Sequence, residues 1–378
     1  MKNVLITGGA GFIGSNLALA LLSRGYQVTV LDNLSKQIHS DDPEQSPLYV
    51  NIKDQVRFIK GDVTSRADLL EAITGSEVIV HLAAETGTGQ SMYEIEKYCN
   101  VNIGGTALLL DILTNEKGLK IEKLIIASSR SIYGEGKYKN NAGELVYPGA
   151  RLEIDMHAGD FEVKDPNTHE DLTLLPTDEE SKIHPSSVYG ISKQNQEQMF
   201  LTVGKALGIP AVAFRYQNVY GPGQSLSNPY TGILSIFSTL IKNGKDINVF
   251  EDGKESRDFV FIEDVVDATI LGIEKNEANN KVFNVGSGVA TDVLTVANTL
   301  KATYNSTVDI NVTGNYRLGD IRHNYADLTL IKRELGFEPK YDFKTGIGLF
   351  AEWVNNQEIK TSQYDESISE MKEKGLFK

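Results

Sequence analysis

The chain has 378 residues, 40% hydrophobic and 23% charged, which is ordinary for a folded protein of two domains or one domain with an added lobe. No apolar run approaches the roughly 18–20 residues of a membrane helix, and the N-terminal run is shorter than the roughly 7–15 of a signal peptide. The net charge of −14 disfavours nucleic acid and anionic lipid as partners. A single cysteine, Cys99, excludes an intrachain disulfide and a multi-cysteine metal site. We therefore expect a cytoplasmic protein with no nucleic-acid, membrane or metal partner.

Strand-like and helical segments alternate over the first 130 residues. Strands are expected at 4–7, 26–31, 56–59, 77–82 and 123–128, and helices at 12–22, 67–73 and 100–113. This alternation predicts parallel βαβ units and a Rossmann-like, doubly wound sheet of the α/β class. A helix at 187–206 and strands at 211–216 and 282–285 are expected next. We expect a nucleotide-binding domain over 1–222 and 256–285, and a smaller substrate-binding domain over 223–255 and 286–378.

Residues 135–180 break the alternation. They contain twelve acidic and four basic residues, three prolines and no sustained hydrophobic period. Such a segment is typical of an insertion, either a lid or a surface lobe. Because it leaves the chain between Ser129 and Tyr189, we expect a mobile lobe near the mouth of the substrate cleft.

Gly8, Gly11 and Gly14 lie between the first expected strand and the first expected helix. A glycine turn in that position lets a pyrophosphate approach the helix N-terminus. Asp32 follows Gly14 by 18 residues, near the roughly 20 expected for a carboxylate that binds ribose hydroxyls. A carboxylate there repels a 2′-phosphate, so the pattern favours NAD over NADP.

Tyr189 and Lys193 form a Y-x-x-x-K pair at the start of an expected helix. This spacing places the phenol and the ammonium on one helix face, where the cation lowers the pKa of the tyrosine toward that of a useful general base. The same spacing recurs at 49/53, 93/97 and 133/137. A Pro- and Asp-rich loop disfavours the first pair and intervening glycines the third, while a surface pair explains the second equally well. Only Tyr189 and Lys193 follow a strand that ends in hydroxyls, Ser128 and Ser129.

Further motifs follow in one order along the chain. They are GGAGFIG at 8–14, Asp32, Asp62-Val63, HLAA at 81–84, Asn102 with Gly105-Thr106, Ser128-Ser129, Tyr133-Gly134, Tyr189 with Lys193, RYQNVYGP at 215–222, RDFV at 257–260, and Ala326-Asp327 before LGF at 335–337. This order resembles the extended short-chain dehydrogenase/reductase family of nucleotide-sugar enzymes. The resemblance covers nearly the whole chain except 135–180 and roughly the last 25 residues.

The resemblance implies roles for individual residues. Tyr189 would be the acid/base, Lys193 would bind the nicotinamide ribose, and Ser129 would hydrogen-bond the sugar oxygen. The other residues implied beside NAD are Gly8, Gly11, Phe12, Ile13, Gly14, Asp32, Asn33, Asp62, Val63, Leu82, Ala83, Ala84, Asn102, Ser128 and Tyr216. Those implied beside the substrate are Thr86, Gly87, Arg130, Asn218, Arg257, Arg317 and Asp320, of which Asn218, Arg257 and Arg317 would hold the diphosphate.

Several of these residues have ordinary alternatives. A helix N-cap explains Asp62 and Val63 as well as an adenine contact does. A turn cap would explain Asn218, and surface ion pairs would explain Arg257 and Arg317. Arg322 and His323 stay open, with a satisfied polar role favoured for the histidine.

Arg130 and Ser131 stand where dehydratase members of the family carry an Asp-Glu pair, and an arginine cannot serve as the acid of that pair. Dehydration is therefore disfavoured, and the resemblance implies an epimerase with tightly held NAD that works as a homodimer on a nucleotide-diphosphate sugar. Residues 84–93 and the long insertion are similar to the dTDP-L-rhamnose 4-epimerase type, although the cysteine pair of its insertion is absent.

Other members of the family stay open as alternatives. They are a UDP-sugar 4-epimerase, a CDP-sugar 2-epimerase and a sugar-nucleotide dehydratase or oxidoreductase. A non-enzymatic NAD sensor would have no need of the Tyr189 and Lys193 pair.

Overall fold

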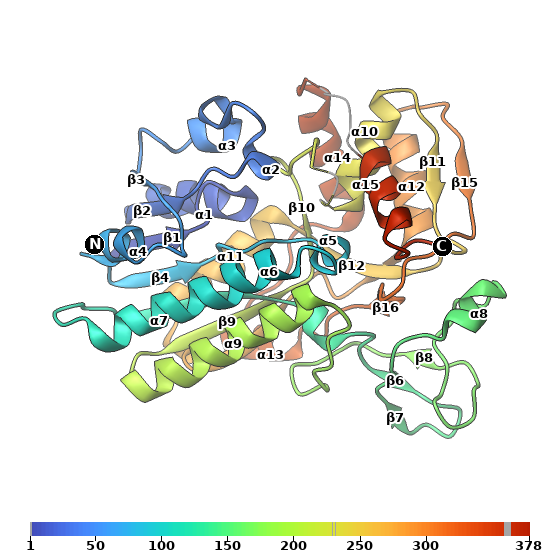
Figure 1. Ribbon diagram of the computed structural model, residues 1–378, viewed down its shortest axis with the longest axis horizontal. Helices are drawn as coiled ribbons and strands as arrows, with labels where there is room; N and C mark the ends of the chain where they lie inside the picture. Colours follow the sequence, from blue (N-terminus) through green and yellow to red (C-terminus); the bar gives the residue numbers. More distant parts are fainter. Residues whose placement is uncertain (1, 229, 231, 359–363) are drawn as a thin grey trace.

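The computed structural model describes residues 2–228, 230, 232–358 and 364–378. At its centre is a parallel sheet of seven strands in the order β13-β9-β5-β4-β1-β2-β3 (Figure 1). The strands are β1 (Asn3–Thr7), β2 (Gln27–Asp32), β3 (Arg57–Lys60), β4 (Val78–His81), β5 (Lys123–Ser129), β9 (Ala211–Tyr216) and β13 (Lys281–Val285). All six neighbouring pairs are parallel. The expected α/β doubly wound sheet is confirmed.

Helices cover both faces of this sheet. One layer contains α1 (Phe12–Ser23) and α11 (Ile262–Glu274), and the other contains α4 (Arg66–Ile73), α7 (Thr106–Asn115) and α9 (Val188–Leu207). Side chains of β5 alternate between the two cores: Leu124 and Ile126 pack toward the α9 layer, whereas Ile125 and Ala127 pack toward the α11 layer. A strand buried on both faces has a continuous run of apolar residues, and β5 has such a run at 124–127.

The helix expected at 100–113 differs from the observed structure. A π-helical segment, Cys99–Gly105, precedes α7. Short helices α2 (Lys36–His39), α3 (Pro47–Val50), α5 (Thr88–Ser91) and α6 (Ile95–Tyr98) and 3₁₀ turns Pro43–Gln45, Arg130–Tyr133 and Asn276–Ala278 occupy the loops. Periodicity alone cannot distinguish a π-helical segment, which occurs frequently at functional sites, from the start of an α-helix.

A second group of elements is formed by the C-terminal part of the chain. Its strands are β10 (Asn218–Tyr220), β12 (Ser256–Phe261), β14 (Ala290–Asp292) and β16 (His323–Asn324), with β11 (Ile247–Val249) paired to β15 (Ile310–Val312). Its helices are α10 (Ile233–Lys242), α12 (Val293–Thr303), α13 (Thr329–Leu335), α14 (Phe343–Asn355) and α15 (Tyr364–Glu373). Among the described residues, no helix combines the length and the apolar character of a membrane span.

Residues 135–180 form a lobe that projects from the body of the molecule in Figure 1. It contains a small antiparallel sheet of β6 (Tyr138–Lys139), β7 (Leu145–Val146) and β8 (Thr173–Leu174), and a short helix, α8 (Glu153–His157).

Ion pairs of two buried arginines, Arg322 and Arg151, hold this lobe to the C-terminal part of the chain. The guanidinium of Arg322 is fully buried and donates to Glu162 of the lobe at 2.5 Å, to Glu251 at 2.8 Å and to Asp252 at 2.7 Å. Arg151 of the lobe donates to Glu251 at 2.8 Å. The lobe is thus a folded unit joined by ion pairs to the C-terminal part of the chain, and its mobility stays a prediction.

Candidate active site

A cavity of about 590 Å³ opens at the carboxyl ends of the central strands. Open parallel sheets bind their ligands at this edge. The cavity brings together the predicted residues Gly8, Gly11, Phe12, Ile13, Gly14, Asp32, Asn33, Val63, Leu82, Ala83, Ala84, Thr86, Gly87, Ser128, Ser129, Arg130, Tyr189, Lys193, Tyr216, Asn218, Arg257, Arg317 and Asp320. Two predicted residues, Asp62 and Asn102, do not line it.

The glycine turn between β1 and α1 is tightly packed on one side and open on the other. A Cβ on Gly8, whose φ is +68°, would lie 2.8 Å from the Cα of Ala83, and a Cβ on Gly14 would lie 2.4 Å from the carbonyl oxygen of Gly8. A Cβ on Gly11 would meet only that carbonyl oxygen, at 3.2 Å. The bare backbone at Gly11, the N-cap of α1, therefore leaves room for a pyrophosphate.

Asp32 ends β2 with its carboxylate at the cavity wall. One oxygen accepts a hydrogen bond from the amide of Ala10 at 2.9 Å and the other from the amide of Leu34 at 2.8 Å. Burial raises the pKa of Asp32, and these two hydrogen bonds oppose the rise. The amides hold the carboxylate in place while each oxygen keeps a second lone pair for a ribose hydroxyl.

The two predicted residues outside the cavity have structural partners. Asp62 accepts from the side chain of Asn33 at 2.9 Å and from the amide of Thr64 at 2.8 Å. The alternative of a helix N-cap is wrong for Asp62, because the N-cap of α4 is Ser65. The buried side chain of Asn102 donates to the Glu85 carbonyl at 3.1 Å and to the Ser192 hydroxyl at 2.9 Å. Asn102 thus joins the loop after β4 to α9.

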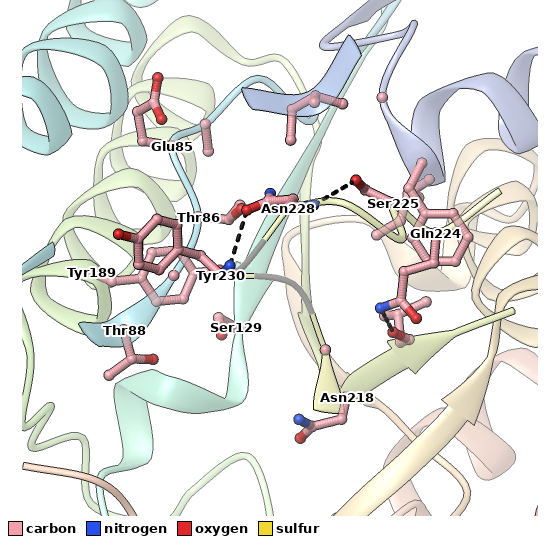
Figure 2. Close-up of a pocket in the computed structure, with 18 of the residues that line it drawn as sticks. Glu85, Thr86, Thr88, Ser129, Tyr189, Asn218, Gln224, Ser225, Asn228 and Tyr230 are labelled. Atoms are coloured by element: carbon pink, nitrogen blue, oxygen red, sulfur yellow. Dashed lines mark hydrogen bonds between the residues drawn. The ribbon is translucent and has the colours of Figure 1, made fainter. Parts of the chain in front are cut away.

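Tyr189 and Ser129 lie on one side of the cavity, opposite Asn218 and Gln224 (Figure 2). The Ser187 hydroxyl caps α9 at the amide of Gly190, at 3.1 Å, so that the helix begins just before Tyr189. Burial raises the pKa of Tyr189, whereas its interactions with the Ser129 hydroxyl and the Arg130 guanidinium lower it.

Lys193 lies one turn further along α9, and burial lowers its pKa to about 7. Its ammonium donates to the side-chain oxygen of Gln196 at 2.8 Å. The support of the Tyr189 phenolate by Lys193 stays a prediction, because burial has the largest effect on the pKa of Tyr189 in the chain without NAD. The net shift is upward, and Arg130 is the cation that opposes it.

Cationic side chains gather on the opposite wall. Arg257 is 8% exposed, donates to the Arg322 carbonyl at 2.8 Å and pairs with Asp320 at 3.4 Å. The Arg317 guanidinium lies 4.8 Å from the centre of the Phe250 ring. Within the described residues, Nη1 of Arg130, Nε of Arg317 and Oδ1 of Asn218 are buried without a hydrogen-bond partner. Buried cationic donors without partners are suited to an anionic ligand such as a diphosphate.

The sequence analysis missed many of the residues that line the cavity, among them two groups from the C-terminal part of the chain. Gln224, Ser225, Asn228 and Tyr230 follow β10, where Asn228 donates its amide to the Ser225 hydroxyl at 3.2 Å (Figure 2). The polar run directly after the RYQNVYGP motif was a usable signal for this loop.

The second missed group comes from α15. Its Tyr364 and Met371 line the cavity. The Glu370 carboxylate accepts from the hydroxyls of Tyr93 and Tyr230, both at 3.1 Å, and thereby ties α15 to the rim of the cavity. No motif in the last residues of the chain indicates this contact.

Comparison with known proteins agrees with this geometry. A profile of the NAD dependent epimerase/dehydratase family matches residues 4–150 and 165–286. The chain belongs to this family. Its cofactor is NAD, and it is an enzyme of the epimerase type, an isomerase. Residues 151–164, which the profile leaves unmatched between its two matched stretches, lie within the lobe.

Individual members of the NAD dependent epimerase/dehydratase family align over almost their full length. The dTDP-L-rhamnose 4-epimerase of Burkholderia thailandensis is 37% identical over 356 residues, covering 93% of this chain and 95% of the relative. The crystal structure of UDP-glucose 4-epimerase from Thermotoga maritima with UDP-glucose superimposes with a TM-score of 0.75 at 29% identity, covering 93% of this chain and 98% of that one. UDP-N-acetylglucosamine 4-epimerase from Methanobrevibacter ruminantium gives a TM-score of 0.74 at 28% identity, covering 94% and 99%.

Replacing Asp32 by serine should weaken NAD binding by about 1–3 kcal/mol, because a charged hydrogen-bond acceptor is lost from a buried position. NAD released from the purified, denatured protein and quantified per chain measures the effect. Asp42→Ser, at an exposed position, is the matched control and should retain the wild-type content. Wild-type NAD content in the Asp32 variant would contradict the assigned ribose contact.

Proposed function

We propose that the protein is an NAD-dependent nucleotide-sugar 4-epimerase that acts on a dTDP-6-deoxyhexose of the dTDP-L-rhamnose type. The observation that carries the proposal is the single tyrosine acid/base, Tyr189, with Arg130 beside it in place of a dehydratase acid. The similarity to the Burkholderia thailandensis enzyme supports the choice of sugar. We also propose that it works as a cytoplasmic homodimer in the supply of sugars for cell-surface polysaccharide, with the domain division given above.

NAD fits the residues present. Gly11 leaves the turn open for the pyrophosphate, Asp32 offers oxygens to the ribose of the adenosine, and Lys193 offers ammonium protons to the other ribose. When bound, NAD supplies the hydride acceptor and donor at the reacting carbon.

The chain's own residues control the proton at the sugar O4. Tyr189, as the phenolate, removes this proton while the Ser129 hydroxyl hydrogen-bonds the same oxygen. The Arg130 guanidinium favours the phenolate and thus offsets part of the effect of burial. In the return half-reaction the phenol of Tyr189 gives the proton back, so one acid/base serves both halves.

The arginines of the opposite wall hold the rest of the substrate. Arg257 and Arg317, with the side-chain amide group of Asn218, line the cavity and would donate to the diphosphate, and Nε of Arg317 has no hydrogen-bond partner in the described residues. With the diphosphate anchored, the keto sugar turns about its link to the phosphate and presents its other face. The rim formed by Tyr93, Tyr230 and α15 would limit the size of the sugar.

The proposal is tested with dTDP-L-rhamnose in deuterium oxide. Return of the hydride within one active site predicts C4 epimerisation without deuterium at C4, observed by NMR and mass spectrometry. Deuterium at the inverted carbon would contradict the mechanism, because it would show proton abstraction from carbon. Turnover of UDP-glucose at a higher kcat/KM than the dTDP-sugar would contradict the choice of substrate.

A further inference from the structure

A chain of buried hydrogen bonds runs from β1 to Lys193 behind the cavity. The Thr7 hydroxyl oxygen lies 2.7 Å from Nδ1 of His81, and Nε2 of His81 lies 3.1 Å from the Thr106 hydroxyl oxygen. The side-chain nitrogen of Gln196 donates to the same hydroxyl oxygen at 2.8 Å, and its side-chain oxygen accepts from the Lys193 ammonium at 2.8 Å. All five residues of this chain of hydrogen bonds are at most 3% exposed.

The donors and acceptors in this chain have one consistent direction. The hydroxyl proton of Thr106 goes to the Asn102 carbonyl at 2.6 Å, so the Thr106 oxygen has only lone pairs left for Gln196 and His81. Nε2 of His81 must therefore carry a proton, and Nδ1 accepts from the Thr7 hydroxyl. The ring is neutral, in keeping with burial that lowers the pKa of His81 to about 3.

This direction fixes the amide of Gln196 with its oxygen toward Lys193. Among the described residues, no carboxylate lies within ion-pair distance of Lys193. The titratable group whose interaction with the ammonium is observed is the neutral His81 on β4, and Tyr189, one turn earlier on α9, lines the same cavity. Gln196 is thus the protein acceptor that holds the ammonium, and it holds it without neutralising the charge.

We propose that Gln196 is a positioning residue that fixes the Lys193 ammonium through the Thr106–His81 hydrogen-bond chain and leaves its charge available to groups that bind in the cavity. Those groups are the ribose of NAD and the negative charge that forms on Tyr189 during turnover. The interaction with the charge on Tyr189 rests on the proposed function, whereas the interaction with the ribose of NAD does not. A carboxylate in the place of Gln196 would neutralise the ammonium, and an apolar side chain would leave it without an acceptor.

Two near-isosteric variants should therefore act in opposite directions. In Gln196→Glu, a carboxylate at hydrogen-bond distance raises the pKa of Lys193, and the pH at which half of the NAD dissociates should rise by about 1–2 pH units. In Gln196→Leu, the charged form loses its acceptor, so this midpoint should fall. NAD retained per chain after dialysis at a series of pH values, without sugar substrate, gives both midpoints. Gln198→Glu, exposed on the same helix, is the control and should leave the midpoint unchanged.

A second pair of variants tests the chain beyond Gln196 and keeps the test decisive if a Gln196 variant does not fold. Thr106→Val removes the hydroxyl that orients the amide, whereas Thr106→Ser keeps it. The midpoint of NAD release should fall in the valine variant and return to the wild-type value in the serine variant. Equal midpoints for valine and serine would overturn the proposal.

The outcomes for the proposal and for the epimerase assignment are separable. In turnover of the dTDP-sugar, Gln196→Glu should move both limbs of the pH–rate profile to higher pH, because the neutralised lysine supports the Tyr189 phenolate less well. If the sugar is not epimerised but the NAD midpoints move in opposite directions, the inference stands and the proposed function fails. If the sugar is epimerised and both Gln196 variants keep the wild-type midpoint, the inference is wrong.

Discussion

Replacing Tyr189 by phenylalanine should lower kcat by about 10²–10⁴-fold, the usual contribution of a positioned acid/base. The fold and the bound NAD should be retained, because the variant keeps the backbone partners of this residue: its amide donates to Ser91 and its carbonyl accepts from Ser192. The change removes only the phenolic hydroxyl and its interaction with the Ser129 hydroxyl. Burial raises the pKa of Tyr189, so the phenolate needed for oxidation is scarce at low pH and the wild-type rate should fall as the pH decreases.

The control for this variant comes from another Y-x-x-x-K pair in the chain. Tyr49 packs edge-on against Phe58 with ring centroids 4.7 Å apart, and it does not line the cavity. Tyr49→Phe should therefore keep the wild-type rate. Steady-state kinetics and NAD content of both variants test the assignment, and near-normal turnover by the Tyr189 variant would refute it.

Replacing Arg322 by methionine should lower the free energy of unfolding by at most about 3 kcal/mol, the lower end of the cost of removing one partner from a buried ion pair. The cost is limited because Glu251 keeps Arg151 as a second cation and the carboxylates of Glu162 and Asp252 are partly exposed. The variant leaves the carboxylates of Glu162, Glu251 and Asp252 without their shared cation. Urea denaturation at pH 7 measures the loss. Arg333→Met is the matched control: that side chain is 66% exposed and pairs with Glu334, so its loss should cost at most about 1 kcal/mol.

The destabilisation in the Arg322 variant should depend on pH. The hydrogen bond from His323 and the pairing with Arg322 lower the pKa of Glu162 to about 2. A carboxyl with a lowered folded-state pKa stabilises the fold above its unfolded pKa, and this stabilisation is lost as the pH falls through the folded value. The difference between wild type and variant should therefore shrink between about pH 4.5 and pH 2. A difference that stays constant over this range would show that Arg322 acts through packing alone.

The features that the sequence predicted correctly depend on local patterns. The central strands were predicted from short apolar runs, and the glycine turn and Asp32 from their spacing within one βαβ unit. The structure places the turn and Asp32 together at the carboxyl edge of the sheet. The raised pKa of Tyr189 was not predictable in this way, because it results from burial by segments distant in sequence. The contact of α15 with the cavity was equally hidden, since its only local signal is an amphipathic helix.

Arg322 and its acidic partners have a consequence for how the chain folds. The partners are separated from Arg322 by 160 and 71 positions in the sequence, and contacts of such separation form late because closing long loops costs entropy. During synthesis the lobe thus emerges well before the cation that anchors it. The lobe contains twelve acidic and four basic residues, and repulsion between its acidic side chains would keep the unfolded lobe solvated during that interval. The acidic charge of the lobe would then have two successive effects: it would oppose association of the nascent chain, and it later supplies Glu162 to the ion pair with Arg322.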